Sequence, residues 1–337
     1  MTDKSIDKVA VIIPNLNGAA YIGKAIDSLL KQDFRNDIIV VENASSDNSM
    51  DILHNYANKI TIIENERNLG FAGGVNTGIE YALQRGYDAV ALFNNDAVAS
   101  KDWLSELVRS MRKSETIGIA TCKIKLADGS GLDSTGEFYT SWGMPYPRGR
   151  GKLITQFSNE GFVFGASGGA SLYRADLFRS IGMFDDRFFA YYEDTDISFR
   201  AQLAGWKVAY NPLSTVTHRQ GETSKKMVKG FTVYQTFKNL PMLFWKNVPR
   251  ELLFKIGLRF FLAYSLIFAK ALFGGNAWPA LKGYAAWLAL IPHTILKRRV
   301  IQQNKSVSAD YIDSILVHDL PPDQTGIRKF RKIFTRK

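Results

Sequence analysis

Three carboxylates lie close together in the segment YYEDTDISFR, at residues 191–200. Glu193, Asp194 and Asp196 fall at the start of a predicted helix, where acidic side chains cap free N–H groups and complement the helix dipole. Capping accounts for one acid but not for three. A carboxylate in this position can act as a general base that takes the proton from an attacking hydroxyl group. The segment therefore predicts proton-transfer chemistry, with each of the three acids a candidate base.

A second group of candidate residues is the sequence NND at Asn94, Asn95 and Asp96, which follows a predicted strand. Mg²⁺ and Mn²⁺ prefer oxygen ligands, keep several waters and take further ligands from substrate phosphates. Asp96, at the end of a predicted strand, is therefore a candidate carboxylate ligand for such a cation.

The elements that must position these residues alternate between strands and helices over residues 9–121. This alternation predicts an α/β fold with a parallel sheet and helices on both faces, and ligands bind such sheets at the carboxyl ends of the strands. Polar clusters follow all four predicted strands. The predicted strands are VAVII, DIIVV, KITII and DAVALF, with helices from about 20 to 31, from 47, from 72 and after 101; the clusters are PNLN (14–17), ENASSDNS (42–49), NERNLGFAGGVN (65–76) and NND (94–96).

Beyond residue 124 the alternation weakens into a stretch rich in glycine, serine and aromatic residues. The segment SWGMPYPRGRGK at 141–152 is typical of a long flexible loop, and long loops are often functional. Its cations Arg148, Arg150 and Lys152, with Arg174 further along, are candidates for contacting phosphate.

Composition excludes several classes of protein. The only cysteine, Cys122, rules out an internal disulfide and a CxxC-type zinc site. The segment MTDKSIDKVAVIIP begins with acidic and polar residues and has an apolar run of five, so we expect no secretory signal and a catalytic part in the cytosol.

The positive charge is confined to the C-terminal third, since residues 1–218 carry a net charge of −4 and residues 219–337 carry +15. Its apolar stretches, 252–273 and 278–296, are interrupted by few charges, and Lys255, Arg259 and Lys270 share one side of a helical wheel. This pattern favours amphipathic helices in a membrane interface over a spanning helix. Helices that pack into a core are the alternative. Nucleic-acid binding is disfavoured because no binding motif accompanies the charge.

Taken together, VIIPNLN, VVENASSDNS, NLGFAGGVNTGI, LFNND and YYEDTDISFR followed by His218 resemble the family 2 glycosyltransferases of GT-A fold, over residues 8–220. The resemblance implies a catalytic domain at 1–220, with a donor-binding half at about 1–122 and an acceptor-binding half at about 123–220. A basic helical region for membrane association would follow at 221–337. The pattern is most similar to enzymes that transfer rhamnose or galactofuranose to lipid-linked or polysaccharide acceptors.

The resemblance also assigns roles to individual residues. Asp194 becomes the base, Glu193 an acceptor-binding residue and Asp196 a support for the helix start or for Arg200. Asp96 and His218 become metal ligands, and Glu42 stands where the family usually has an Asp that reads the N–H of a pyrimidine ring. The remaining candidates are Pro14 and Asn17 against the nucleoside, Arg67, Asn68 and Gly73 near the ribose or diphosphate, the amides Asn94 and Asn95 on sugar or ribose, and Gly168 and Gly169 along the acceptor channel.

The sequence thus predicts a metal-dependent, inverting transferase at the cytoplasmic face of the cell membrane, with Mn²⁺ or Mg²⁺ as cofactor. The resemblance implies a dTDP- or UDP-sugar as donor, with dTDP-rhamnose as the first choice, and a polyprenyl-diphosphate-linked sugar or a glycan as acceptor. An oligomer is possible. A noncatalytic nucleotide-sugar-binding or assembly subunit is the alternative. A dinucleotide-binding oxidoreductase would need GxGxxG where PNLNGAAY stands. A synthase that exports its product would need several uninterrupted membrane spans.

Overall fold

The computed structural model describes residues 6–219 and 228–318 of the 337-residue chain. Residues 1–5 and 220 of the predicted catalytic domain lie outside these ranges. Residues 221–227 and 319–337 of the predicted C-terminal region lie outside them as well.

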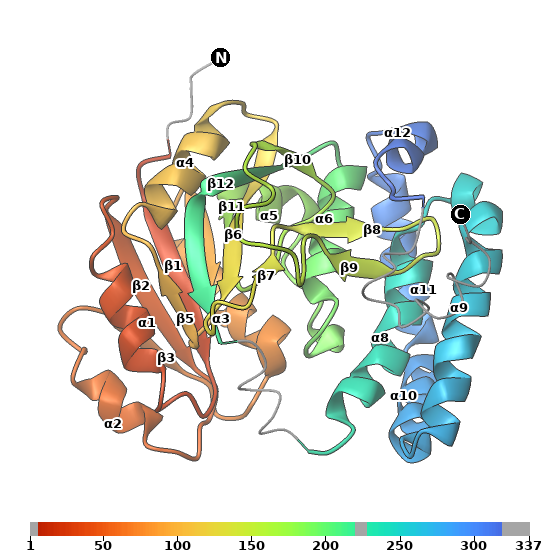
Figure 1. The fold of residues 1–337 in the computed structure, drawn as a ribbon, viewed down its shortest axis with the longest axis horizontal. Helices are drawn as coiled ribbons and strands as arrows, with labels where there is room; N and C mark the ends of the chain where they lie inside the picture. Colours follow the sequence, from red (N-terminus) through yellow and green to blue (C-terminus); the bar gives the residue numbers. More distant parts are fainter. Residues whose placement is uncertain (1–5, 220–227, 319–337) are drawn as a thin grey trace.

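The described chain is built around one large mixed sheet with the strand order β10-β12-β6-β11-β4-β1-β2-β3 (Figure 1). Strand β5 pairs with β12, β7 pairs with β6, and β8 and β9 form a separate two-stranded sheet. The strands are β1 (Val9–Asn15), β2 (Asn36–Glu42), β3 (Thr61–Glu64), β4 (Ala89–Phe93), β5 (Ala97–Ala99), β6 (Ile117–Leu126), β7 (Leu132–Ser134), β8 (Glu137–Tyr139), β9 (Pro145–Pro147), β10 (Gly161–Val163), β11 (Ala170–Arg174) and β12 (Lys207–His218).

Helices cover both faces of the sheet, and a further helical layer lies beside it (Figure 1). The helices are α1 (Ile22–Leu29), α2 (Ser49–His54), α3 (Gly70–Gln84), α4 (Trp103–Arg112), α5 (Ala175–Ile181), α6 (Glu193–Leu203), α8 (Phe231–Asn247), α9 (Leu253–Phe273), α10 (Ala277–Ala289), α11 (Ile291–Gln303) and α12 (Ala309–Ser314), with short 3₁₀ turns η1 (Asp186–Phe188) and η2 (Arg250–Leu252).

Strand β1 shows why the central strands are almost continuously apolar. Val9, Val11 and Ile13 face the core formed with α1, α2 and α4, whereas Ala10 and Ile12 face the core formed with α3, α5 and α6. A strand alternates its side chains between the two faces, and here both faces are buried, so polar residues are confined to the strand ends. The polar clusters therefore stand at those ends, where sheets of this kind bind ligands.

The predicted strand–helix alternation is confirmed, with helix boundaries that differ by two residues. The parallel arrangement holds for β1 to β4. Strand β11, inserted between β4 and β6, is antiparallel to both. The prediction of a flexible loop at 141–152 is wrong for its centre, since residues 145–147 form β9 and pair with β8.

A third apolar core lies outside the sheet, between α6, the β8–β9 hairpin and the helices from α8 onwards. Helix α8 is largely buried in this core, and α10 and α11 cover it. Helix α9 buries only one side, through residues such as Ile256 and Phe260. Within the described residues, one helical stretch, Arg250–Phe273, is long and apolar enough to cross a membrane, and a third of its most apolar window is buried inside the molecule. Packing into a core is thus confirmed for part of this region, and association with a membrane interface stays a prediction.

Candidate active site

Asp96 and His218 come together at neighbouring strand ends. Asp96 follows β4, His218 ends β12, and β5 joins the two by pairing Ala97 with His218. The imidazole Nε2 lies 3.1 Å from Asp96 Oδ1 and 3.2 Å from the side-chain amide of Asn94. Both predicted metal ligands are thus within reach of one ion.

The arrangement fits a hard divalent cation. Two adjacent ligands of an octahedral ion with bonds of 2.0–2.1 Å lie about 3 Å apart, which matches the separation between Asp96 Oδ1 and His218 Nε2. Oxygen and imidazole nitrogen together suit Mn²⁺. Over residues 6–219 and 228–318, no group of three or more His, Cys, Asp or Glu side chains is arranged to hold a metal ion. A metal here would therefore take its other ligands from a diphosphate and from water.

One neighbour of this pair was missed by the sequence analysis. Asp133 Oδ2 lies 2.8 Å from His218 Nδ1, and Asp133 Oδ1 accepts a hydrogen bond of 2.9 Å from Arg150. Burial alone would lower the pKa of His218, but the hydrogen bonds to Asp133 and Asp96 outweigh it and raise that pKa to about 9. Burial of Asp133 opposes its ionisation, yet the bond from His218 and the charge of Arg150 lower the pKa of its carboxyl. A single acid in a three-residue strand carries no clear signal in the sequence.

The donor-side candidates form a second network at the ends of β1, β2 and β4. Asn15 donates to Glu42 Oε2 at 2.6 Å and accepts from Asn95 Nδ2 at 2.8 Å, and all three side chains are buried. Glu42 Oε1 accepts from the backbone N–H of Ser45. Residue 42 is thus fixed in position at the strand end, and Asn15, which the sequence analysis did not single out, connects it to the NND sequence.

The loops after β1 and β2 hold each other through side chains. Asn17, in the left-handed region with a φ of 51°, accepts a hydrogen bond from Ser46 N–H. Asp47 accepts from Ser49 N–H at the start of α2 and from Ala19 N–H. Asp47 thus ties the loop after β1 to the start of α2. Pro14 is partly buried beside these loops.

The glycine-rich candidates at 65–76 are used for close packing. Gly73 lies inside α3, and a Cβ there would come 2.6 Å from Leu69 Cβ. Asn68 accepts from Gly70 N–H and from Asn43. Arg67 is exposed at the sheet edge. Packing explains the glycine at 73 without a ligand, and a donor contact by Arg67 or Asn68 stays a prediction.

The loop before α6 has an unusual backbone. Phe189, Tyr191 and Tyr192 all have positive φ, between 64° and 73°. Each non-glycine residue in this region costs on the order of 1–3 kcal/mol, and such strain clusters at functional sites. The strained backbone ends at Glu193 and Asp194, which begin α6.

These two acids sit in different surroundings. Asp194 is partly exposed and accepts from the N–H groups of Gly168, at 3.2 Å, and Thr195, at 2.8 Å. Glu193 is buried, and its Oε2 has no hydrogen-bond partner in the part of the chain that the structure describes. Burial, reinforced by the charge of Asp194, raises the pKa of Glu193 to about 8. Burial also raises the pKa of Asp194, although its hydrogen bonds act against this.

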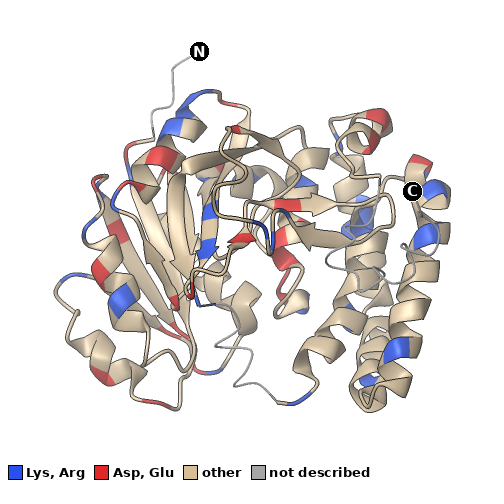
Figure 2. Cartoon of the chain, viewed as in Figure 1, with Lys and Arg blue, Asp and Glu red and all other residues tan. Residues whose placement is uncertain are grey.

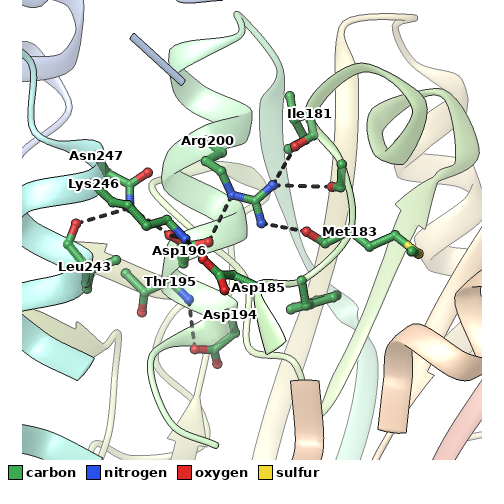
Figure 3. Close-up of polar contacts among 12 residues, drawn as sticks. Ile181, Met183, Asp185, Asp194, Thr195, Asp196, Arg200, Leu243, Lys246 and Asn247 are labelled. Carbon is green, nitrogen blue, oxygen red and sulfur yellow. Dashed lines mark hydrogen bonds and ion pairs between the residues drawn. The ribbon is translucent and has the colours of Figure 1, made fainter. Parts of the chain in front are cut away.

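Asp196 belongs to a separate buried ion network (Figure 3). It bonds Arg200 Nε at 2.9 Å, as predicted, and also accepts from Asn247 Nδ2 at 2.8 Å and pairs with Lys246 at 2.9 Å. Lys246 pairs in turn with Asp185 at 2.5 Å. Asp196 points into this network and Asp194 points away from it, so the two acids have different surroundings.

Helix α8 also holds the strained loop directly. Asn239 donates to the carbonyl oxygens of Phe188, Ala190 and Tyr191, at 2.9–3.0 Å. Lys238 donates to Phe188, and burial lowers the pKa of Lys238 to about 8 although the charge of Glu193 acts against this. These contacts join residues about 50 positions apart and could not be found from sequence spacing.

Gly168 and Gly169 connect the two groups of candidates. Gly168 N–H donates to Asp194, and Gly169 O accepts from Asn94 N–H at 2.9 Å. A Cβ on Gly168 would come 3.2 Å from the ring of Phe71, and one on Gly169 would come 2.8 Å from Asn94 Nδ2. Two adjacent residues without side chains thus bring the carboxylate at 194 next to the NND sequence.

A second acid that the sequence analysis missed is Glu137, at the start of β8. It is buried, and burial, with the charge of Asp194, raises the pKa of its carboxyl well above the usual range. The predicted acceptor side therefore gathers carboxyl groups from β8 and from the start of α6.

The four cations predicted to meet phosphate are engaged in different ways. Arg148 packs over the rings of Phe157 and Tyr210, and Arg150 bonds Asp133. The backbone oxygen of Lys152 accepts from Leu132 N–H. The expectation for Arg174 is wrong, because its buried guanidinium bonds the carbonyl oxygens of Met111 and Ile117, next to the starts of β4 and β6 and opposite the strand ends that carry Asp96 and His218.

Known proteins with similar sequences include a whole family of transferases. The profile of the family described as Glycosyl transferase family 2 matches residues 10–182, just over half of the chain. The low-salt glycan biosynthesis hexosyltransferase Agl10 of Haloferax volcanii is 25% identical over 214 residues, which cover 60% of this chain and 65% of that protein. The match therefore spans less than two thirds of that relative.

Solved structures with the same fold include nucleotide-sugar complexes. TarS 1-349 of S. aureus in complex with UDP-GlcNAc has a TM-score of 0.54 and 18% identity, and the match covers 91% of this chain and 90% of that one. The mannosyltransferase PcManGT of Pyrobaculum calidifontis in complex with GDP-Man and Mn²⁺ also has a TM-score of 0.54, with 16% identity and coverages of 99% and 89%.

Proposed function

The chain belongs to glycosyl transferase family 2, with the GT-A fold, and on that premise we propose that it is a metal-dependent inverting glycosyltransferase. The observation that carries the proposal is the junction at Gly168 and Gly169, which sets Asp194 next to Asn94 and so next to Asp96 and His218. A base and a diphosphate-binding group on either side of one sugar are what a direct transfer requires.

In the proposed reaction, Asp194 takes the proton from the acceptor hydroxyl as its oxygen bonds to the anomeric carbon. The bond from that carbon to the diphosphate breaks, and its electron pair leaves with the diphosphate. One direct displacement inverts the anomeric configuration. A divalent ion bound by Asp96 and His218 would neutralise charge on the diphosphate. Glu193, kept protonated by burial, can donate a hydrogen bond to the acceptor from its unpaired Oε2.

We further propose a pyrimidine nucleotide sugar as donor, with dTDP-rhamnose the first to test. Each oxygen of Glu42 already accepts one hydrogen bond, from Asn15 or from Ser45, and a remaining lone pair can accept the ring N–H of uracil or thymine, which purines do not present in the same way. The similar proteins TarS and PcManGT were solved with UDP-GlcNAc and GDP-Man, so UDP- and GDP-sugars belong in the same panel.

Calorimetric titration tests this proposal. One dTDP- or UDP-sugar is expected to bind at least about tenfold more tightly with Mn²⁺ or Mg²⁺ than without, because the ion screens the diphosphate. Asp96→Asn should lose this metal-dependent gain, whereas Asp102→Asn, at an exposed position before α4, should keep it. Absence of binding to every nucleotide sugar by the folded protein would instead favour a noncatalytic subunit.

We propose that the helices α9 to α11 dock the protein on an anionic membrane, where a lipid-linked or glycan acceptor would be met. Exposed apolar side chains run along α9, including Leu258, Leu262 and Leu266, and continue on α10 with Trp278. The sequence from 252 to 309 contains eight Lys and Arg residues and no Asp or Glu, and Figure 2 shows blue segments along these helices. An apolar face bordered by cations is typical of an interfacial helix.

Vesicle sedimentation tests the docking face. The triple change Leu258→Glu, Leu262→Glu and Leu266→Glu is expected to reduce binding to anionic vesicles at least about tenfold, because it removes inserted apolar surface and adds repulsion. The matched control places the same three charges at exposed apolar positions elsewhere, Leu153, Ile154 and Leu213. If both triple variants lost vesicle binding equally, α9 would not be the docking surface.

A further inference from the structure

Asp133 is a buried acid beside the candidate metal ligands, and no role has yet been given to it. It is 4% exposed, and both of its carboxylate oxygens are engaged. Oδ2 meets His218 Nδ1 at 2.8 Å, and Oδ1 meets Arg150 Nη2 at 2.9 Å. Arg150 Nε also donates to the backbone oxygen of Asp133. The carboxylate is therefore held from two sides and cannot rotate without losing a charged hydrogen bond.

The backbone at this position is shaped to present the side chain. Strand β7 pairs with β6 on one side, through Ile124 with Ser134 and Lys125 with Leu132, which leaves Asp133 as the extra residue of a β-bulge. Strand β12 pairs with β6 and ends at His218. Bulges redirect a side chain at the rim of a sheet, often next to active sites. Two strands that pair with β6 thus bring an acid and an imidazole together beside the last residues of β6.

We infer that Asp133 is a positioning residue for the metal ligand His218, by fixing the ring so that Nε2 faces Asp96 and the incoming ion. An imidazole has two nitrogens, and the hydrogen bond at one decides which of them is left for a metal. With Nδ1 bound to Asp133, Nε2 is the nitrogen that lies 3.1 Å from Asp96. The inference rests on the proposed metal-dependent function.

Arg150 has a corresponding place in this arrangement. It binds the carboxylate oxygen that His218 does not use, so it keeps Asp133 from turning toward the diphosphate region. Partners of this kind behind a metal-ligating histidine raise metal affinity by about 10–100-fold.

The test uses the full-length chain and measures Mn²⁺ affinity from the loss of the free-ion electron spin resonance signal, with and without UDP. Asp133→Leu is expected to weaken Mn²⁺ binding by about 10–100-fold. Asp133→Asn should lose less, because its amide oxygen still accepts from His218 Nδ1. The control changes Asp128→Leu and Asp128→Asn, at an exposed acid in the β6–β7 turn bonded to Ser130, should stay within about twofold of the parent.

A double-mutant cycle separates positioning from a general structural role. In the His218→Ala background, titrated to millimolar Mn²⁺, Asp133→Asn is expected to have no further effect, because its action passes through the ring. The positioning role of Asp133 would be overturned if Asp133→Asn lowered Mn²⁺ affinity equally in the parent and in the His218→Ala variant. It would also be overturned if the variants at 133 bound Mn²⁺ like the parent. Neither result would contradict the metal-dependent function. A parent chain that binds no Mn²⁺ under either condition would overturn the metal-dependent function and this inference with it.

Discussion

Replacement of Asp194 by asparagine is expected to lower kcat by at least about a hundredfold and to leave nucleotide-sugar binding nearly unchanged. General-base catalysis contributes about 10²–10⁴ to a rate, and an amide cannot take the proton. The asparagine oxygen can still accept a hydrogen bond from Gly168 or Thr195, so the start of α6 should persist. Turnover of the donor identified by calorimetry, with donor affinity measured in parallel, checks this prediction.

The matched control is Asp186→Asn, at an exposed acid in η1 on the same segment of chain. Its turnover should stay within about twofold of the parent, since surface changes of this kind rarely matter. Near-normal turnover of Asp194→Asn would show that Asp194 is not the general base. Glu193 and Glu137 would then be the candidates for that role.

Replacement of Lys246 by methionine is expected to destabilise the protein by about 3–5 kcal/mol. The ammonium group is buried between Asp185 and Asp196, and its removal leaves two buried carboxylates without their shared cation (Figure 3). Methionine retains most of the side-chain volume, so the loss reports on charge. The midpoint of urea denaturation, with an unchanged dependence on urea concentration, measures the effect.

Lys305→Met provides the comparison for that experiment. Lys305 pairs with Glu251, whose side chain is 57% exposed, and exposed pairs contribute about 0–1 kcal/mol. If Lys246→Met lowered the free energy of unfolding no more than Lys305→Met does, water would have to reach the ion network and solvate its charges.

The residues of the candidate site that follow strand ends are predictable from the sequence. Asp96 and the polar loops after β1, β2 and β3 were predictable because a buried parallel strand permits polar side chains only where it ends. The acids at the start of α6 were found because their number exceeds what a helix start requires. The fold class followed from the same alternation of strands and helices.

Residues brought in from distant elements could not be predicted in this way. Asp133 reaches His218 through a β-bulge, and a bulge leaves no periodic pattern in a three-residue strand. Asn239 and Lys246 lie in a helix whose composition suggested only an apolar, basic region, yet their polar atoms bond the loop and helix that carry Asp194. Arg174 was expected to contact phosphate because of its charge. Strand β11 is antiparallel to β4, so it places Arg174 beside the start of β4, opposite the candidate site.

The position of α8 sets a limit on how this chain can be recombined with its relatives. The helix supplies Lys238, Asn239, Lys246 and Asn247 to the backbone and ion network around the start of α6, and it also packs against α10 and α11. A chimera joined at residue 220 would give the catalytic half a foreign helix in place of its own. A junction after Val248 would keep these four side chains with the strained loop that they hold, so α8 is inherited with the catalytic half and the exchangeable part begins beyond it.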